Sequence, residues 1–156
     1  MWNCIAKNDR DVISLHDSRA TGIHMDGKDL VLDFADGFWL VHGSRYNPHE
    51  NTLRTDAAQV RFVDFEIENF YVFKVVRLFR KPIFTKRIEM DLQTLIDNVN
   101  SGAWELEFLD EYTRFRGLLF NCWIWHKKGH TQECQISMDC TETQYYWNSI
   151  REDRIW

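Results

Sequence analysis

The thiol and imidazole side chains in the last third of the sequence are the first candidates for chemistry: Cys122, His126, His130, Cys134 and Cys140. Zinc prefers such ligands, and a structural zinc takes four of them. The spacing argues against a site, because apolar and polar residues alternate on both sides of a Lys-Lys-Gly turn and predict a β-hairpin. His126 then lies opposite His130 and Cys122 opposite Cys134, with ~14 Å between the two pairs. One zinc needs all its ligands within ~2.3 Å. We therefore expect no metal site, two adjacent core thiols and a histidine pair at the solvent end.

A second set consists of polar side chains suited to recognition of a partner. We assign a binding role to His16, Asp17, Arg45, Tyr46, His49 and Arg54. Asp17 beside His16 suggests a carboxylate that orients an imidazole, but neighbours on an extended chain point to opposite sides, so the pair is interpreted first as a turn. The other four lie in residues 42–57, where periodicity disappears. A connection of this length is either a binding loop or a solvated crossover between sheets.

Sequence motifs for catalysis and cofactor binding are absent. The chain has no Gly-rich phosphate loop, no Gly-x-Ser-x-Gly elbow, no His-Glu-x-x-His and no Cys-x-x-Cys. A triad assembled in space stays open, but no residue is nominated as catalytic. We expect no cofactor.

The charge of the chain bears on its partners. The formal charge is −5 and the pI is near 5.6. This balance lacks the basic footprint of nucleic-acid binding and suits a basic protein partner. Residues 1–10 are mixed polar, unlike a secretory signal, and no apolar run approaches the ~20 residues of a membrane-spanning helix. We expect a cytoplasmic protein with reduced thiols and no membrane association.

Residues 15–41 predict three consecutive strands. An Asp26-Gly27 turn between alternating apolar runs is a hairpin signal, and it places Ile23 opposite Leu30. A second turn at Gly37 leads to a third strand that begins at Phe38.

The middle of the chain predicts longer strands. Val60–Ile67 and Phe70–Phe79 are candidates, with a tight turn at Glu66–Asn69 between them. Phe70–Phe79 is apolar on both faces, which fits either a central strand covered on both sides or a strand whose outer face meets a partner. Pro82 ends it, since proline cannot donate to an interior ladder, and Ile83–Met90 is a further strand.

One helix is predicted. Asp91 is a good N-cap, apolar residues recur at helical spacing up to Val99, and Gly102 follows as a stop signal. The next strand, Trp104–Phe108, alternates apolar with acidic residues and is closed by Asp110.

These elements predict a mainly β fold. We expect a two-layer antiparallel β-sandwich or flattened barrel, with one short α-helix at about residues 91–100. The length fits a single domain, residues 1–156.

The opening of the chain also carries a resemblance. Leu15–Arg19, Ile23 and Leu30–Phe34 resemble the start of small uncharacterised bacterial proteins, some of them similar to immunity proteins of polymorphic toxin systems. The resemblance implies a β-rich domain and a toxin-neutralising partner, and it transfers no catalytic residue. We expect a non-enzymatic binding protein, an immunity-like inhibitor of a basic toxin domain. Two alternatives stay open: a small-molecule-binding or hydrolytic protein whose cleft uses a His and a carboxylate, and a phage or assembly structural component.

Overall fold

The computed structural model describes residues 1–115 and 117–156, and these residues form a mainly β fold. The elements are β1 (Cys4–Lys7), β2 (Ile13–Ser14), β3 (Ser18–Ala20), β4 (Gly22–Asp26), β5 (Asp29–Phe34), β6 (Trp39–Leu40), β7 (Leu53–Thr55), β8 (Ala58–Val63), β9 (Glu66–Leu78), β10 (Lys81–Glu89), α1 (Leu92–Asn100), β11 (Trp104–Thr113), β12 (Gly117–His126), β13 (Thr131–Asp139), β14 (Glu142–Trp147) and β15 (Ile150–Ile155).

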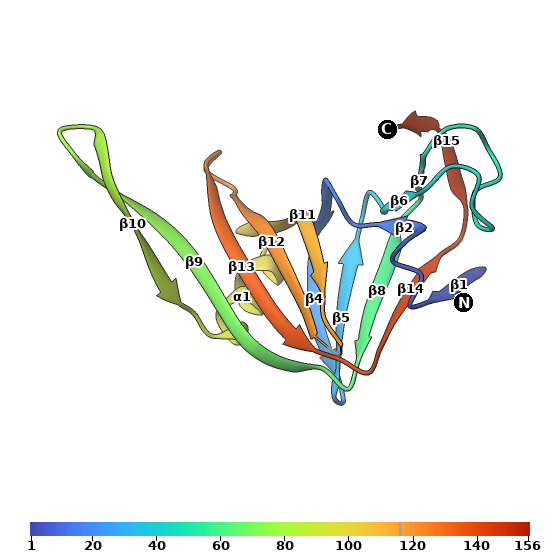
Figure 1. Cartoon of the computed structure of the whole chain (residues 1–156), viewed down its shortest axis with the longest axis horizontal. Coiled ribbons are helices and arrows are strands. Elements are labelled where there is room, and N and C mark those ends of the chain that lie inside the picture. The colour runs from blue at the N-terminus through green and yellow to red at the C-terminus, as the bar shows by residue number, and fades with distance from the viewer. Residues whose placement is uncertain (116) are drawn as a thin grey trace.

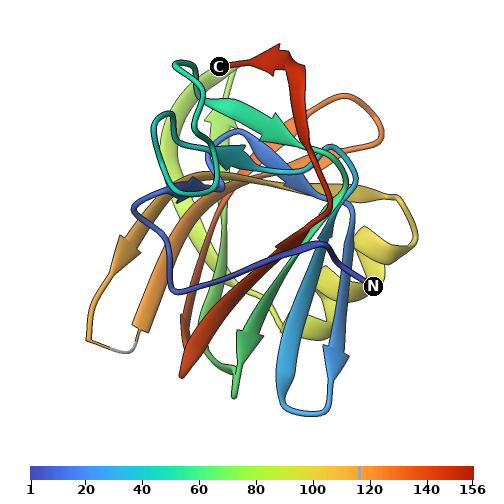
Figure 2. The same ribbon diagram turned by 90° about the vertical axis from the view of Figure 1, so that its right-hand side faces the viewer.

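Three antiparallel sheets build the molecule. The strand orders are β10-β9-β13-β12-β11-β3, β1-β14-β8-β5-β4 and β15-β7-β6-β2. The six-stranded and five-stranded sheets face each other, and β8 to β9 and β13 to β14 cross between them at one end (Figure 1). The small sheet lies across the opposite end, above the five-stranded sheet (Figure 2). The sandwich is therefore confirmed.

One hydrophobic core joins the two large sheets. Phe62 on β8 meets Phe120 on β12 with ring centroids 5.9 Å apart, and Phe34 on β5 meets Phe108 on β11 at 5.8 Å. Large aromatic side chains dominate such cores because each buries 150–250 Å². Helix α1 adds Leu95, Ile96 and Val99 to the same cluster.

The predicted three-stranded unit at residues 15–41 does not stay in one sheet, which corrects that prediction. Strands β4 and β5 form the expected hairpin, but β3 pairs with β11 and β6 pairs with β2 and β7. The hairpin register also differs by two residues, because Ile23 pairs with Leu32 instead of Leu30 and Asp26 pairs with Asp29. Gly27 supplies the positive φ of +64° at the first loop position, which suits a turn of the II′ kind.

Strand β9 is longer than predicted. The expected turn at Glu66–Asn69 is wrong: these residues are extended and pair with β13, and the chain turns instead at Asp64, whose φ is +48°. Only Phe70 and Val72 of this strand are buried. A central strand covered on both sides is therefore also wrong for the second half of β9.

The predicted cap of helix α1 is confirmed, and the predicted end of the following strand, β11, is corrected. Asp91 caps α1 by accepting hydrogen bonds from the backbone N–H groups of Gln93 and Thr94, as predicted. Strand β11 does not end at Asp110 but continues to Thr113 through a bulge between Phe108 and Asp110. The bulge resets the alternation of side chains, which turns Glu111 toward the interior, where its burial raises its pKa.

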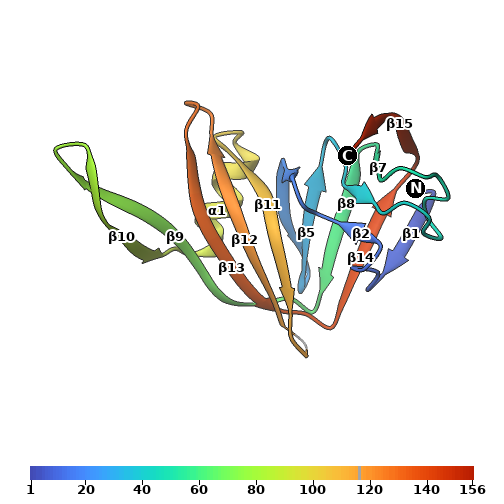
Figure 3. The ribbon, with the colours of Figure 1, turned by 45° about the horizontal axis from the view of Figure 1, so that its top comes forward.

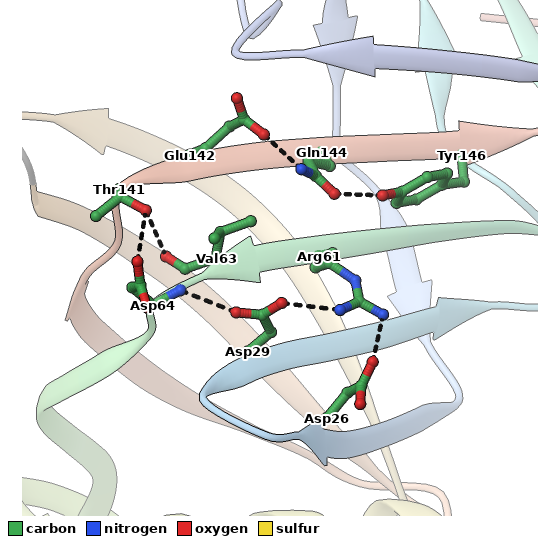
Figure 4. A network of polar contacts seen from close by, with 9 residues as sticks. All are labelled: Asp26, Asp29, Arg61, Val63, Asp64, Thr141, Glu142, Gln144 and Tyr146. Carbon is green, nitrogen blue, oxygen red and sulfur yellow. Dashed lines mark hydrogen bonds and ion pairs between the residues drawn. The ribbon is translucent and has the colours of Figure 1, made fainter.

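The solvent face of the five-stranded sheet carries a network of polar contacts (Figure 4). Arg61 donates to Asp26 at 2.6 Å and to Asp29 at 2.8 Å, while Asp29 accepts from the backbone N–H of Asp64 at 3.0 Å. That backbone bond, with Arg61, lowers the pKa of Asp29. The network fixes the β4–β5 turn against the β8–β9 corner. Among the described residues, no helix is long and apolar enough to cross a membrane.

Candidate interaction site

The predicted binding residues fall into two groups. His16, Asp17 and Arg54 converge where β3 and β11 of the six-stranded sheet meet the small sheet. Arg45 and Tyr46 lie on the connection between β6 and β7, against Asp9. His49 lies 3.9 Å from Glu152 on β15.

An acidic pocket forms at Asp17 and Arg54 of the first group. It encloses about 390 Å³ and is lined by Asp17, Arg19, Thr21, Asp36, Arg54, Glu105 and Glu107. Four carboxylates and two guanidinium groups leave a formal charge of −2. The carboxyl group of Asp17 is half-exposed, and its backbone φ of +53° confirms that His16-Asp17 is a turn.

Arg54 forms one wall of the pocket. Its guanidinium stacks 4.8 Å from the ring centroid of Trp39 and donates to the backbone oxygens of Asp36 at 2.8 Å and Asp17 at 3.3 Å. Burial lowers the pKa of Arg54, and the charge of Asp36 opposes that effect. The hydrogen bonds to backbone oxygens position Arg54, and the charges of Asp36 and Asp17 act on its guanidinium without a direct hydrogen bond to either carboxylate.

Arg19 forms the opposite wall, which sequence reasoning missed. It lies 3.2 Å from Glu105 and 3.5 Å from Glu107, and it stacks 4.0 Å over Trp125. Glu107 is buried and also accepts a hydrogen bond from the indole of Trp125. The charge of Arg19 is therefore engaged within the wall, and the negative charge open to a ligand belongs to Asp17 and Asp36.

Aromatic rings lie behind the Arg54 wall of the pocket, where Trp39 stacks on Arg54. The ring of His16 stacks on Trp156 at 5.3 Å, and Trp156 lies 5.4 Å from Trp39. Trp156 and Ile155 are 57% and 58% exposed. Nδ1 of His16 bonds to the backbone oxygen of Leu109, and Nε2 lies 3.6 Å from Asp17. The imidazole thus contacts backbone and carboxylate, an arrangement suited to binding.

The second group has a structural role. Tyr46 donates to Asp9 at 2.5 Å and packs edge-on against Trp147 at 5.3 Å, and Arg45 also binds Asp9. The Tyr46 hydrogen bond, with Arg45, lowers the pKa of Asp9. Asn47 is fully buried and donates to the backbone oxygens of Leu40 and Asn51, each at 2.9 Å. These contacts fasten the loop to the body.

The hairpin of thiols and imidazoles has the predicted register. Cys122 pairs with Cys134, and both are buried. The rings of His126 and His130 stack at 4.0 Å at the far end. Burial raises the pKa of Cys122 and, with His130, lowers that of His126. Within the part of the chain that the structure describes, no group of three or more His, Cys, Asp or Glu is placed to hold a metal ion.

A larger pocket of about 750 Å³ lies beside the N-terminal segment. At its wall, Arg10 Nε is 3.0 Å from Glu111 Oε1. Neither atom has a well-aligned hydrogen bond to the residues described. This ion pair fastens the N-terminal segment to β11, and Asp11, Asp110 and Arg114 also line the pocket.

No family model, curated protein or solved structure matches this chain. The resemblance to immunity proteins therefore stays a prediction, and the geometry of the acidic pocket has to carry the functional argument.

Proposed function

We propose that the chain is a non-enzymatic binding protein that holds a basic protein partner at the acidic pocket. The single observation behind this proposal is a pocket lined by two open carboxylates, Asp17 and Asp36, whose wall residue Arg54 stacks on Trp39. The exposed ring of Trp156 lies 5.4 Å from Trp39. A lysine or arginine of the partner would enter the pocket, and an adjacent apolar side chain would pack on the indole. Tryptophan is one of the residue types enriched in binding hot spots.

The acidity of the chain supports the same reading. A negative protein attracts a basic partner over long range and accelerates the encounter. An immunity-like inhibitor of a basic toxin domain is the specific form of this proposal, and its support is the resemblance at residues 15–34 together with the charge of the pocket.

The test is affinity capture from the native host with matched baits. Asp17→Asn/Asp36→Asn removes two charges while keeping a residue type that tolerates positive φ at position 17. Glu50→Gln/Glu89→Gln removes the same charge from exposed sites outside the pocket. We expect a basic protein on the wild-type and control baits, and at least about tenfold weaker binding, or 1.4 kcal/mol, with the pocket variant.

Trp156→Ala tests the aromatic contact of the site separately from its carboxylates. It should weaken binding of the same partner without changing the charge of the pocket. Equal capture by the wild-type and Asp17→Asn/Asp36→Asn baits, or capture of acidic proteins only, would refute the proposal.

A further inference from the structure

The second half of β9 and strand β10 form a two-stranded ribbon that stands away from the other strands, as two views show (Figures 1 and 3). We call residues 74–87 the arm. Large apolar side chains on it are exposed: Val75 44%, Leu78 56%, Phe79 90%, Ile83 55% and Phe84 56%. A two-stranded ribbon is marginal in water unless something packs against it. Exposed apolar side chains gathered in one place mark interaction sites.

The turn at the end of the arm departs from the usual turn chemistry. Phe79 and Arg80 have φ of +46° and +65°. Two-residue hairpin loops with positive φ strongly favour Asn, Asp or Gly. A bulky aromatic residue in this conformation is uncommon, and such outliers cluster at binding sites. The turn presents a phenylalanine and an arginine at the tip, both residue types that are enriched at interfaces.

The charge of the arm opposes that of the rest of the chain. Residues 69–88 hold six of the nineteen cations and none of the twenty-four carboxylates. The remainder of the chain therefore carries a formal charge of −11. An occupant of the arm must supply negative charge together with apolar contacts.

The outer face of the six-stranded sheet supplies both negative charge and apolar contacts. Trp123 pairs with Glu107 on the strand to one side and with Glu133 on the strand to the other. Asp110 lies in the next row of side chains that point outward from the sheet. Trp123 is 36% exposed, and Asp110 and Glu133 are exposed. A hollow of about 580 Å³ opens here; Trp123, Phe73 and Glu133 line it, as do two cations of the arm itself.

We propose that the arm docks on this outer face of a second copy of the chain, in a two-fold dimer in which each copy receives the arm of the other. In such a dimer Phe79 and its apolar neighbours pack near Trp123, while Arg80 and Lys81 approach Asp110 and Glu133. An isologous contact of this kind closes on itself and needs no further component. The dimer goes beyond the proposed function and uses none of the charges open in the acidic pocket.

Direct pairing of two β10 edges is the less suitable geometry. Pro82 and a register shift interrupt β10, and Lys81 and Lys86 flank the interruption. Proline, bulges and lysine are the features by which proteins protect an exposed edge. Contact through side chains on the ribbon avoids this obstacle.

The size of the contact predicts a weak dimer. Seven residue pairs at ~3.3 Å each and two strands at ~4.8 Å give ~220 Å² per arm. Two reciprocal arms with the faces beneath them bury about 900 Å², which is in the range of weak and transient interfaces. We therefore expect dissociation in the micromolar range and sensitivity to salt.

The test is sedimentation of the full chain from about 1 to 100 µM with charge-swapped pairs. The wild type should pass from monomer to dimer, and 0.5 M NaCl should weaken the dimer. Arg80→Glu/Lys81→Glu alone and Asp110→Lys/Glu133→Lys alone should each be monomeric, while a mixture of the two should form a heterodimer. All four positions are exposed, so circular dichroism should show unchanged folding.

Two further variants test the apolar contact of the arm and the independence of the dimer from the acidic pocket. Phe79→Ser should weaken the dimer at unchanged charge, and Asp17→Asn/Asp36→Asn should leave it intact. A wild type that stays monomeric at 100 µM overturns the inference, whether or not it binds anionic vesicles or oligonucleotides through the arm. A dimer that survives Arg80→Glu/Lys81→Glu, or one lost with Asp17→Asn/Asp36→Asn, also overturns it.

Discussion

The ion pair between Arg10 and Glu111 gives a stability prediction with a pH signature. The two side chains are 25% and 20% exposed. Breaking a fully buried pair costs about 3–5 kcal/mol, whereas exposed pairs contribute about 0–1 kcal/mol. For this partly buried pair we expect Arg10→Met to lower the free energy of unfolding by about 2–3 kcal/mol at pH 7.

The sign of the pH dependence follows from the pKa of Glu111, which burial raises and Arg10 lowers. A carboxyl group with a raised folded-state pKa contributes stability below its unfolded pKa of about 4.3 and loses it as pH rises through the folded value. Without Arg10 the folded pKa rises further, so the loss from Arg10→Met should grow from pH 4 to pH 7. Urea unfolding followed by tryptophan fluorescence at pH 4, 5.5 and 7 measures this difference against the wild type.

Two controls separate charge from packing. Lys7→Met removes an exposed partner of Glu142 and should change stability by less than about 1 kcal/mol at each pH. Arg10→Met/Glu111→Leu removes both charges and should recover most of the loss at pH 7. Arg10 also donates to Thr143, and loss of that bond is independent of pH in this range. An equal loss at pH 4 and pH 7 would show that the bond or packing, and not the charge of Glu111, dominates.

Three other predictions concern the body of the fold. Gly37→Ala places a Cβ 2.3 Å from Thr55 Oγ1 at a φ of +73° and should destabilise by at least about 2 kcal/mol more than Gly43→Ala, where φ is +65° and nothing lies within 4 Å; thermal unfolding compares them. Asn47→Ala leaves two backbone oxygens and the N–H of a loop residue without their partner and should cost about 1–3 kcal/mol in urea unfolding. In a thiol titration only Cys4 should react rapidly, and the three buried thiols should react after unfolding; fast reaction of two or more native thiols would contradict the core assignment.

Local patterns were enough for the cap of α1 and for the register of β12 with β13, which follow from residues a few positions apart. They were not enough for the register of β4 with β5, where the loop is Gly27-Lys28 and not Asp26-Gly27. The sheet to which a strand belongs does not follow from local patterns. Strands β3 and β4 are separated by one residue at a corner, yet they pair in different sheets. The bulge in β11 was also invisible, since the two residues after it, Asp110 and Glu111, are both acidic and give no apolar alternation.

The acidic pocket shows the same limit. Asp17 and Arg54 were selected from the sequence, but their neighbours Trp39, Glu107 and Trp156 come from three other segments. One signal in the sequence could have identified Glu107. It alternates with apolar residues that face the core, so it lies on the opposite face of the sheet, together with the indoles of the next hairpin. Its pairing with Arg19 depends on the contact between β3 and β11, which no local pattern encodes.

The pairing of β1 with β14 has a consequence for how the protein is made. Residues 4–7 lie against residues 144–147, so the first strand has no partner until almost all of this sequence has been synthesised. The five-stranded sheet depends on the same late strand, because β14 stands between β1 and β8. Contacts of such long sequence range slow folding, since the loop must close before the contact stabilises it. Nascent chains that stop before β14 would leave the edge of β8 without its partner strand, which gives a chaperone a defined target during translation.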